Sequence, residues 1–158
     1  VIMLRVSKLT DYASVILTHI AHHPDALHAA SDLTNATGVA LPTVSKILKL
    51  LTKNNILVSH RGSKGGYALV NSPSETNVAD IITAIEGPIS MTECSTISGL
   101  CEQEASCEVK GNWHLINRAV YTAIEAVSLA DMITPVRQQT VNFSVPEMVK
   151  TSDLKVES

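Results

Sequence analysis

The segment ILVSHRGSKGGYALV, residues 56–70, decides the fold of this chain. Two short segments, 56–61 and 67–70, have the pattern and length of β-strands, and the glycine-rich residues 62–66 connect them. The pattern predicts a β-hairpin. Glycines in the connection would let the backbone approach a phosphate or enter a minor groove without a side-chain clash. A nucleotide phosphate loop is excluded, because the G-x-x-x-x-G-K-S/T spacing is missing and a strand follows where a helix would be needed.

Three helices are predicted ahead of this hairpin. Apolar residues at positions 9, 13, 16, 17 and 20 form the stripe of a first helix, which ends near His22-His23-Pro24. A short second helix opens at residues 30–33 and stops at Thr37-Gly38. A third runs from about Pro42 to Asn54, with proline at its first helical position. Helix, helix, helix and hairpin is the order of a winged helix-turn-helix, so the predicted fold is mainly α with a β-hairpin wing.

The third helix is expected to have an apolar face and a basic face. A lysine face on a single helix is most often only solvated, but the hairpin that follows favours a DNA-binding surface. The lysines and the wing arginine would then bind phosphates, and the hydroxyl residues with the wing arginine would read base edges or groove shape. The predicted DNA-contacting residues are Thr43, Ser45, Lys46, Lys49, His60, Arg61 and Lys64.

Charge is divided unevenly along the chain. Residues 1–70 carry seven Lys or Arg against three Asp, a net charge of +4. Residues 71–158 carry five bases against twelve acids, a net charge of −7. The overall charge of −3 therefore hides a basic N-terminal part. This asymmetry is typical of a polyanion-binding module joined to something else.

Composition narrows the class further. Apolar residues make up 45% of the chain and aromatic residues 3%, which predicts an aliphatic and helical core. No run of 18 uncharged apolar residues occurs, so no membrane span is expected. Three cysteines without a signal-peptide pattern favour a reducing cytoplasm over a disulfide scaffold. We find no nucleophile–base pair or acid pair with a supporting motif, so enzymatic activity is not expected.

All three cysteines lie in one polar segment, Cys94, Cys101 and Cys107, within TECSTISGLCEQEASCEVK, residues 92–110. Such a segment offers little apolar surface for packing, and three soft thiolates converging on a metal centre would order it. The alternative is a flexible loop with three inert thiols. The clustering of all three cysteines in a polar segment favours the metal or redox interpretation.

Two further helices flank the cysteine segment. The first spans Asn77 to Glu86 and ends at Gly87-Pro88. The second, from Trp113 to Ile133, would extend about 31 Å. The apolar seam of this second helix consists of Trp113, Ile116, Val120, Ile124 and Val127. The seam would be buried against a second copy of the chain or against its own domain. The expected division is a winged-helix domain at 1–88, a cysteine-rich loop at 89–111, a dimerisation helix at 112–134 and a flexible tail at 135–158.

Taken together, these features resemble those of one known family. RVSKLTDYA (5–13), the helix-turn-helix, RGSKGGYAL (61–69) and the cysteine triplet before a tryptophan-led helix resemble the dimeric winged-helix iron–sulfur regulators, the IscR/NsrR-like family. The resemblance covers about residues 4–133 and is greatest to regulators of SUF cluster-assembly operons. It implies a homodimer on a double-stranded DNA operator of two half-sites, and cluster-assembly proteins as cluster donors. It also implies an iron–sulfur cluster, usually two-iron two-sulfur (2Fe-2S), on the three cysteines.

The resemblance also bears on the fourth ligand. IscR-like members place a histidine three residues after the last cysteine, where this chain has Lys110, and His114 is displaced from the pattern. NsrR-like members use an aspartate of the first helix from the other subunit, and Asp11 matches that position. From the helix pattern alone Asp11 is a surface acid that stabilises a helix N-terminus. The resemblance makes it the leading fourth ligand.

The expected function is a transcriptional repressor that senses iron–sulfur status and controls cluster-assembly genes. Alternatives are a cluster-free redox or zinc sensor on the same scaffold and a nitric-oxide-sensing repressor. A protein–protein adaptor or a cluster-transfer protein that does not bind DNA belongs to a different class, and the segregated basic face argues against it.

Overall fold

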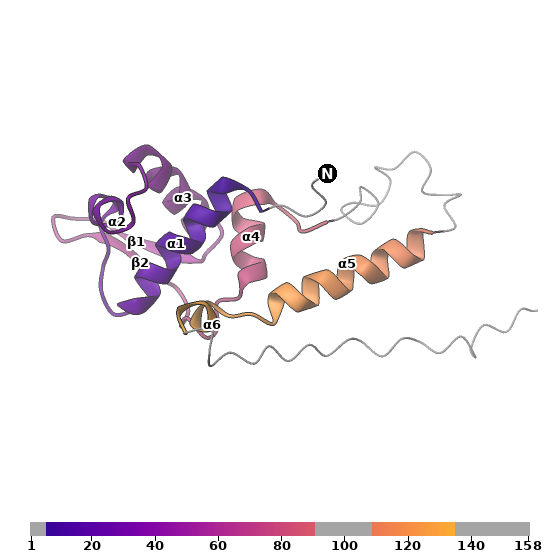
Figure 1. Ribbon diagram of the computed structural model, residues 1–158. Helices are drawn as coiled ribbons and strands as arrows, with labels where there is room; N and C mark the ends of the chain where they lie inside the picture. Colours follow the sequence, from indigo (N-terminus) through magenta and orange to yellow (C-terminus); the bar gives the residue numbers. More distant parts are fainter. Residues whose placement is uncertain (1–5, 91–108, 135–158) are drawn as a thin grey trace, which may run out of the picture.

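The structure, a computed structural model, describes residues 6–90 and 109–134 (Figure 1). A three-helix unit is followed by a two-stranded antiparallel hairpin, which confirms the predicted winged-helix class. In chain order the elements are α1 (Lys8–His22), α2 (Ala30–Thr37), α3 (Leu41–Lys53), β1 (Leu57–His60), β2 (Gly66–Leu69), α4 (Val78–Glu86), α5 (Lys110–Glu125) and α6 (Leu129–Ile133).

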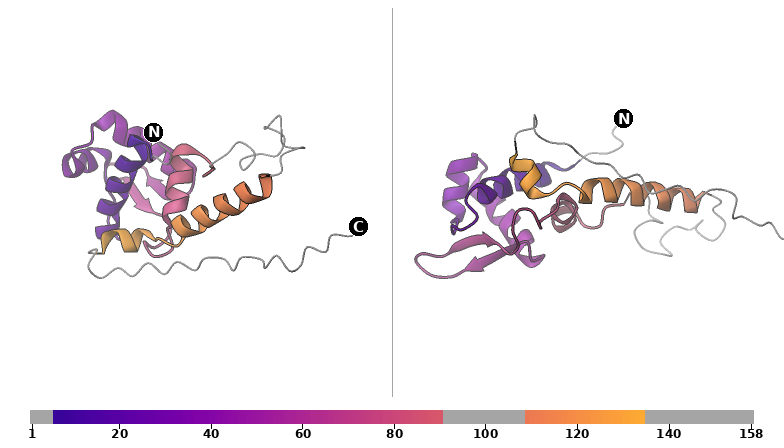
Figure 2. Two further views of the ribbon diagram at one scale, coloured as in Figure 1. Left: turned by 45° about the vertical axis from the view of Figure 1, so that its right-hand side comes forward. Right: turned by 90° about the horizontal axis from the view of Figure 1, so that it is seen from below.

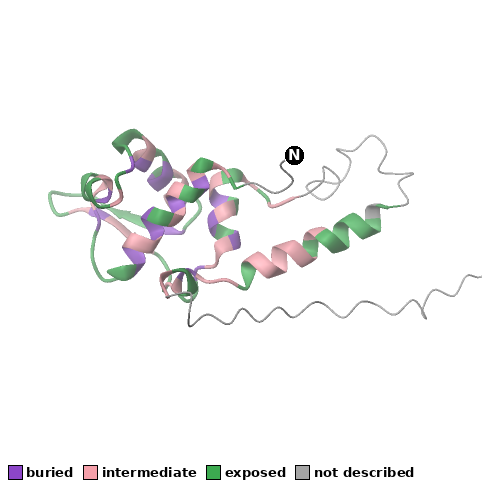
Figure 3. Ribbon diagram, viewed as in Figure 1, coloured by how far each residue is buried: buried purple, intermediate pink, exposed green. Residues whose placement is uncertain are grey.

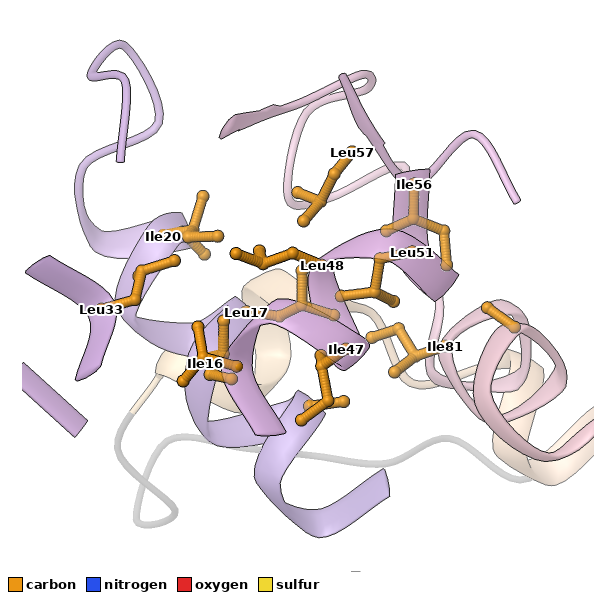
Figure 4. Packing of buried hydrophobic residues seen from close by; sticks show 14 of the residues in the cluster. Ile16, Leu17, Ile20, Leu33, Ile47, Leu48, Leu51, Ile56, Leu57 and Ile81 are labelled. Carbon is orange, nitrogen blue, oxygen red and sulfur yellow. The ribbon is translucent and has the colours of Figure 1, made fainter. Parts of the chain in front are cut away.

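The core lies where α1, α3 and the hairpin meet (Figure 4). It is aliphatic, as the low aromatic content predicted. The apolar stripe of α1 and the apolar face of α3 supply most of it, and α2, β1, α4 and α6 each add at least one side chain. The fully buried large side chains include Ile16, Leu17, Ile20, Leu33, Ile47, Leu48, Leu51, Leu57, Ile81 and Leu129.

The turn between α2 and α3 has the expected chemistry. Gly38 ends α2 in the left-handed region, with φ of 72°, and its N–H donates to the Thr34 carbonyl at 2.9 Å. α3 starts at Leu41, one residue earlier than predicted, so Pro42 stands at the second helical position. Ala40 precedes the helix and offers no capping side chain. These helices form the helix-turn-helix with the basic face of α3 outward.

The hairpin register pairs Leu57 with Leu69 and His60 with Gly66. Each strand is four residues long, and Gly66 belongs to β2 rather than to the loop. A second pairing ties the hairpin to the segment between α1 and α2. There His28 and Tyr67 exchange backbone hydrogen bonds of 3.0 and 2.9 Å. The wing is therefore anchored at its base to the helical unit.

The single helix predicted over Trp113–Ile133 is wrong, because the structure has α5 and α6 with a break between them (Figures 1 and 2). Ser128 lies in extended backbone and caps α6. Ser128 and Asp131 form a reciprocal capping box, with Asp131 N–H donating to Ser128 Oγ at 3.1 Å. Local capping chemistry therefore overrides a helical periodicity that continues across the break.

The break attaches the chain to the start of α4. Val78 N–H donates to the Val127 carbonyl at 2.9 Å, and Leu129 N–H donates to the Thr76 carbonyl at 2.7 Å. Leu129 is fully buried in the core, and α6 packs on α1. Val127, predicted as part of the helix seam, thus lies outside both helices. This end of the predicted dimerisation segment packs on its own domain.

α5 extends from the winged-helix body as an arm (Figures 1 and 3). Its C-terminal half packs beside α4 and is partly buried. Its N-terminal half is exposed, including Trp113 at 38% and Ile116 at 42%. Within the described residues, no helix is both long and apolar enough to cross a membrane. The predicted tail, 135–158, lies outside the described residues.

Candidate DNA interface and cluster site

The outer face of α3 presents the predicted lysines to solvent. Lys46 and Lys49 are exposed, and Thr43 and Ser45 are partly buried at the margins of this face. The opposite face, with Val44 among its residues, is buried. Amphipathic packing therefore fixes which side of α3 faces outward. This arrangement suits an electrostatic contact with a polyanion.

The wing presents the remaining predicted contacts, His60, Arg61 and Lys64, which are all exposed. The backbone geometry of the wing itself requires its glycines. Gly62 has φ of +125°, and a Cβ on Gly65 would lie 2.2 Å from the His60 carbonyl oxygen. A Cβ on Gly66 would lie 2.9 Å from the His28 backbone. The loop thus needs glycine to form its tight turn, whatever it approaches.

Three histidines gather beside the base of the wing. The ring of His19 lies edge-on to His23 at 6.1 Å and to His28 at 5.7 Å between centroids. His28 is buried, and its Nε2 contacts the His23 carbonyl at 3.1 Å. Burial, and after it the neighbouring His28, His23 and His22, lowers the pKa of His19 below 6.5. In residues 6–90 and 109–134, no group of three or more His, Cys, Asp or Glu side chains is arranged so that it could hold a metal ion.

Asp11 lies in the first turn of α1, off the buried stripe, and is exposed. Within the described part of the chain its carboxylate makes no hydrogen bond or ion pair. The neighbouring Thr10 is buried, and its hydroxyl donates to Glu86 Oε1 at 2.5 Å. The same oxygen accepts from Ser7 N–H at 2.8 Å. The first turn of α1 is thereby fastened to the last residue of α4.

The three cysteines lie outside the described residues, so their predicted ligation stays a prediction. The chain that leads toward them leaves α4 through Gly87, at φ of 94°. Further on it borders a cavity of about 470 Å³ between α4 and α5. Its lining residues are Val6, Ile82, Glu86, Gly87, Pro88, Ile89, Ser90, Val120 and Ile124. His114, the displaced histidine, is exposed on α5.

Comparison with known families identifies this arrangement. Residues 6–135 match the Rrf2 family, described as an iron-dependent transcriptional regulator. The chain belongs to the Rrf2 family. It is a DNA-binding transcriptional regulator of that family, and its relatives are regulators, not enzymes.

Individual relatives match most of the length of this chain. Protein rrf2 of Nitratidesulfovibrio vulgaris is 24% identical over 131 residues, covering 82% of this chain and 87% of that protein. The HTH-type transcriptional regulator IscR of Yersinia enterocolitica is also 24% identical over 131 residues, covering 82% of this chain and 79% of IscR. These matches confirm the predicted resemblance to IscR-like regulators.

Solved structures extend the comparison. CymR, the global cysteine regulator of B. subtilis, is 26% identical with a TM-score of 0.64, covering 83% of this chain and 97% of CymR. T. potens IscR has a TM-score of 0.63 at 22% identity, covering 89% and 95%. The second likeness shows the fold alone. Of these two structural neighbours, one is thus called a cysteine regulator and the other is an IscR.

Sequence reasoning missed the link from Glu86 to α1 and the histidine group. The link joins Thr10 and Glu86, which are far apart in the chain, so no local pattern reports it. The histidines are closer in sequence, but His28 lies beyond the end of α1 and meets His19 only because of the path that the chain takes toward α2. The capping box of α6 was also missed, although Ser128-Leu129-Ala130-Asp131 carries the S-x-x-D signal that predicts it.

Proposed function

We propose that this Rrf2-family protein is a homodimeric repressor whose DNA affinity depends on an iron–sulfur cluster, and that it controls cluster-assembly genes. The observation that carries the proposal is the exposed Asp11 in the first turn of α1, whose carboxylate makes no hydrogen bond or ion pair within the described residues, combined with a triplet of cysteines between α4 and α5. The exposed faces of α3 and the wing support operator binding through the residues predicted from the sequence.

The donor set fits such a cluster. Cys94, Cys101 and Cys107 offer soft thiolates of the kind that hold iron–sulfur clusters. Asp11 offers an exposed carboxylate, which from the partner subunit would complete the ligand set. A carboxylate is a harder ligand than thiolate or imidazole, so it would give a labile site suited to sensing. The bound cluster would supply chemistry sensitive to oxidants and to iron supply.

The experiment is anaerobic purification followed by a visible spectrum and assays for iron and acid-labile sulfide. We expect a coloured protein with equal iron and sulfide, and loss of both when any one of the three cysteines is replaced by alanine. Asp11→Ala should keep the dimer but shift the spectrum or speed cluster loss. His114→Ala is the matched control and should change little. Stoichiometric zinc without sulfide in the wild-type protein would refute the cluster.

A cluster-free redox sensor on the same scaffold is the second candidate. The likeness to CymR, which is called a cysteine regulator and not an iron regulator, favours a cluster-free sensor. In that case the purified protein would be colourless, and DNA binding would follow the oxidation state of the cysteines.

A further inference from the structure

The start of α3 is apolar and exposed to solvent. Ala40, Leu41 and Pro42 follow one another there, and all three are exposed, Leu41 at 47%. None of the three has a charged or hydrogen-bonding side chain, and no side chain caps this end of the helix. The start of α3 therefore differs from the rest of its outward face, which presents hydroxyl groups and lysines.

Leu41 lies on the same side of α3 as two of the predicted DNA contacts. Ser45 and Lys49 follow Leu41 at intervals of four residues, so the three positions spread over only about 80° around the helix axis. Leu41 is thus one turn nearer to the N-terminus of α3 than Ser45. In a helix-turn-helix, the N-terminal residues of the second helix are the ones that contact base edges in the major groove.

The chemistry of the Leu41 side chain restricts what it could recognise on DNA. An isobutyl group neither donates nor accepts a hydrogen bond, so the donor and acceptor groups on the base edges offer it no partner. Among the four bases, thymine presents an apolar group in the major groove, its C5 methyl. Contact between the two groups would remove apolar surface of both from water.

We propose that Leu41 is a specificity-determining residue that selects thymine in each operator half-site by packing on the C5 methyl group. The inference rests on the operator-binding part of the proposed function and does not depend on a cluster. It adds an apolar base contact to the hydrogen bonds and phosphate contacts that are predicted for the other residues of α3.

An exposed leucine is also common on surfaces that bind nothing. Leu27 provides the comparison, because its side chain is similarly exposed, at 44%, but it lies between α1 and α2, outside both α3 and the wing. The two roles differ in one measurable property. Only a leucine that packs on a thymine methyl group makes DNA binding sensitive to the removal of that methyl group.

The test uses the full chain, purified anaerobically, as wild type, Leu41→Ala, Leu41→Met and Leu27→Ala. A DNA duplex is first selected from a random library with the wild-type protein. Each thymine of that duplex is then replaced in turn by uracil, which lacks the C5 methyl group and keeps the hydrogen-bonding groups of the base. Every duplex is titrated with every protein at one salt concentration, and the unfolding midpoint of each variant is measured to check its folding.

We expect uracil at one thymine of each half-site to weaken wild-type binding by about fourfold, the affinity equivalent of burying one methyl-sized group. The same uracil should have no effect on Leu41→Ala, which should bind the unmodified duplex about as weakly as wild type binds the uracil duplex. Leu41→Met keeps an apolar side chain of similar volume and should stay sensitive, and Leu27→Ala should match wild type.

Two results would overturn the inference, and they differ in what else they overturn. If each uracil affects wild type and Leu41→Ala equally, Leu41 does not read the thymine methyl group, while operator binding itself stands. If the wild-type protein selects no duplex from the library, operator binding fails and the inference fails with it.

Discussion

At the scale of single residues, environment decides what each ionisable group does. Asp11 is exposed and unpaired among the described residues, whereas Glu86 accepts hydrogen bonds from two donors at the start of α1, the N-cap Ser7 and Thr10. Sequence reasoning placed Asp11 correctly in the first turn of a helix and off its core face, because helical periodicity reports the buried side. It could not find the role of Glu86, because that role arises only when residues 7, 10 and 86 meet.

His19 provides a prediction for pH. Its pKa is lowered from 6.5 mainly by burial, and also by His28, His23 and His22, so the folded protein holds it neutral where the unfolded chain takes up a proton. Stability is therefore full above pH 6.5 and falls as the pH drops below it. His19→Gln should reduce this fall, measured as urea unfolding at a series of pH values. The exposed His60→Gln is the control, and an unchanged slope in His19→Gln would contradict the explanation.

At the scale of elements, amphipathic helices were predictable and their junctions were less so. The apolar faces of α1 and α3 fixed their buried sides and hence the outward lysines of α3. The break between α5 and α6 was not foreseen, because apolar spacing continues across it while Ser128 and Asp131 start a new helix. The cysteine segment has no such pattern, and its residues 91–108 lie outside the described structure.

The tight backbone packing around Gly65 in the wing leads to a prediction about stability. Gly65→Ala would bring a Cβ within 2.2 Å of the His60 carbonyl, so the hairpin would have to shift. We expect a loss of about 1–3 kcal/mol in the free energy of unfolding, together with weaker operator binding. Gly111→Ala is the control, because that position in α5 has open space and alanine favours a helix. Equal stability of Gly65→Ala and wild type would mean that the turn is built differently.

The basic surface carries an electrostatic prediction. Lys46→Ala in α3 and Arg61→Ala in the wing should each weaken DNA binding without unfolding the domain, because both residues are exposed. Each should also reduce the slope of log affinity against log salt by about one unit, as one phosphate contact is lost. Arg118→Ala on α5 removes an exposed charge away from this surface and should leave the slope unchanged. Wild-type slopes in both variants would place the DNA elsewhere.

At the scale of the whole molecule, α5 is the element that we propose for the contact between two copies. Its half near α4 is partly buried within the chain, while Trp113 and Ile116 on the other half are exposed. Apolar side chains on a projecting helix arm are suited to a second copy, as predicted for the family-like dimer. We therefore propose that the dimer contact is made by the N-terminal half of α5.

This narrower seam is testable by charge insertion. Ile116→Glu should place an unpaired carboxylate in the dimer interface and yield monomers at micromolar concentration, measured by sedimentation. His114→Glu, about 160° around the helix from Ile116, should stay dimeric. A monomeric wild-type protein, or a dimeric Ile116→Glu, would show that α5 does not form the interface.

The most direct test of the central claim is one pair of DNA titrations. A single anaerobic preparation is divided, the cluster is removed from one half, and both halves are titrated with operator DNA at the same salt concentration. A cluster that controls DNA binding should change the affinity by a factor of about 5–150, the usual range of coupling between two sites. Equal affinities for the two halves would contradict the proposal that this Rrf2-family regulator senses iron–sulfur status.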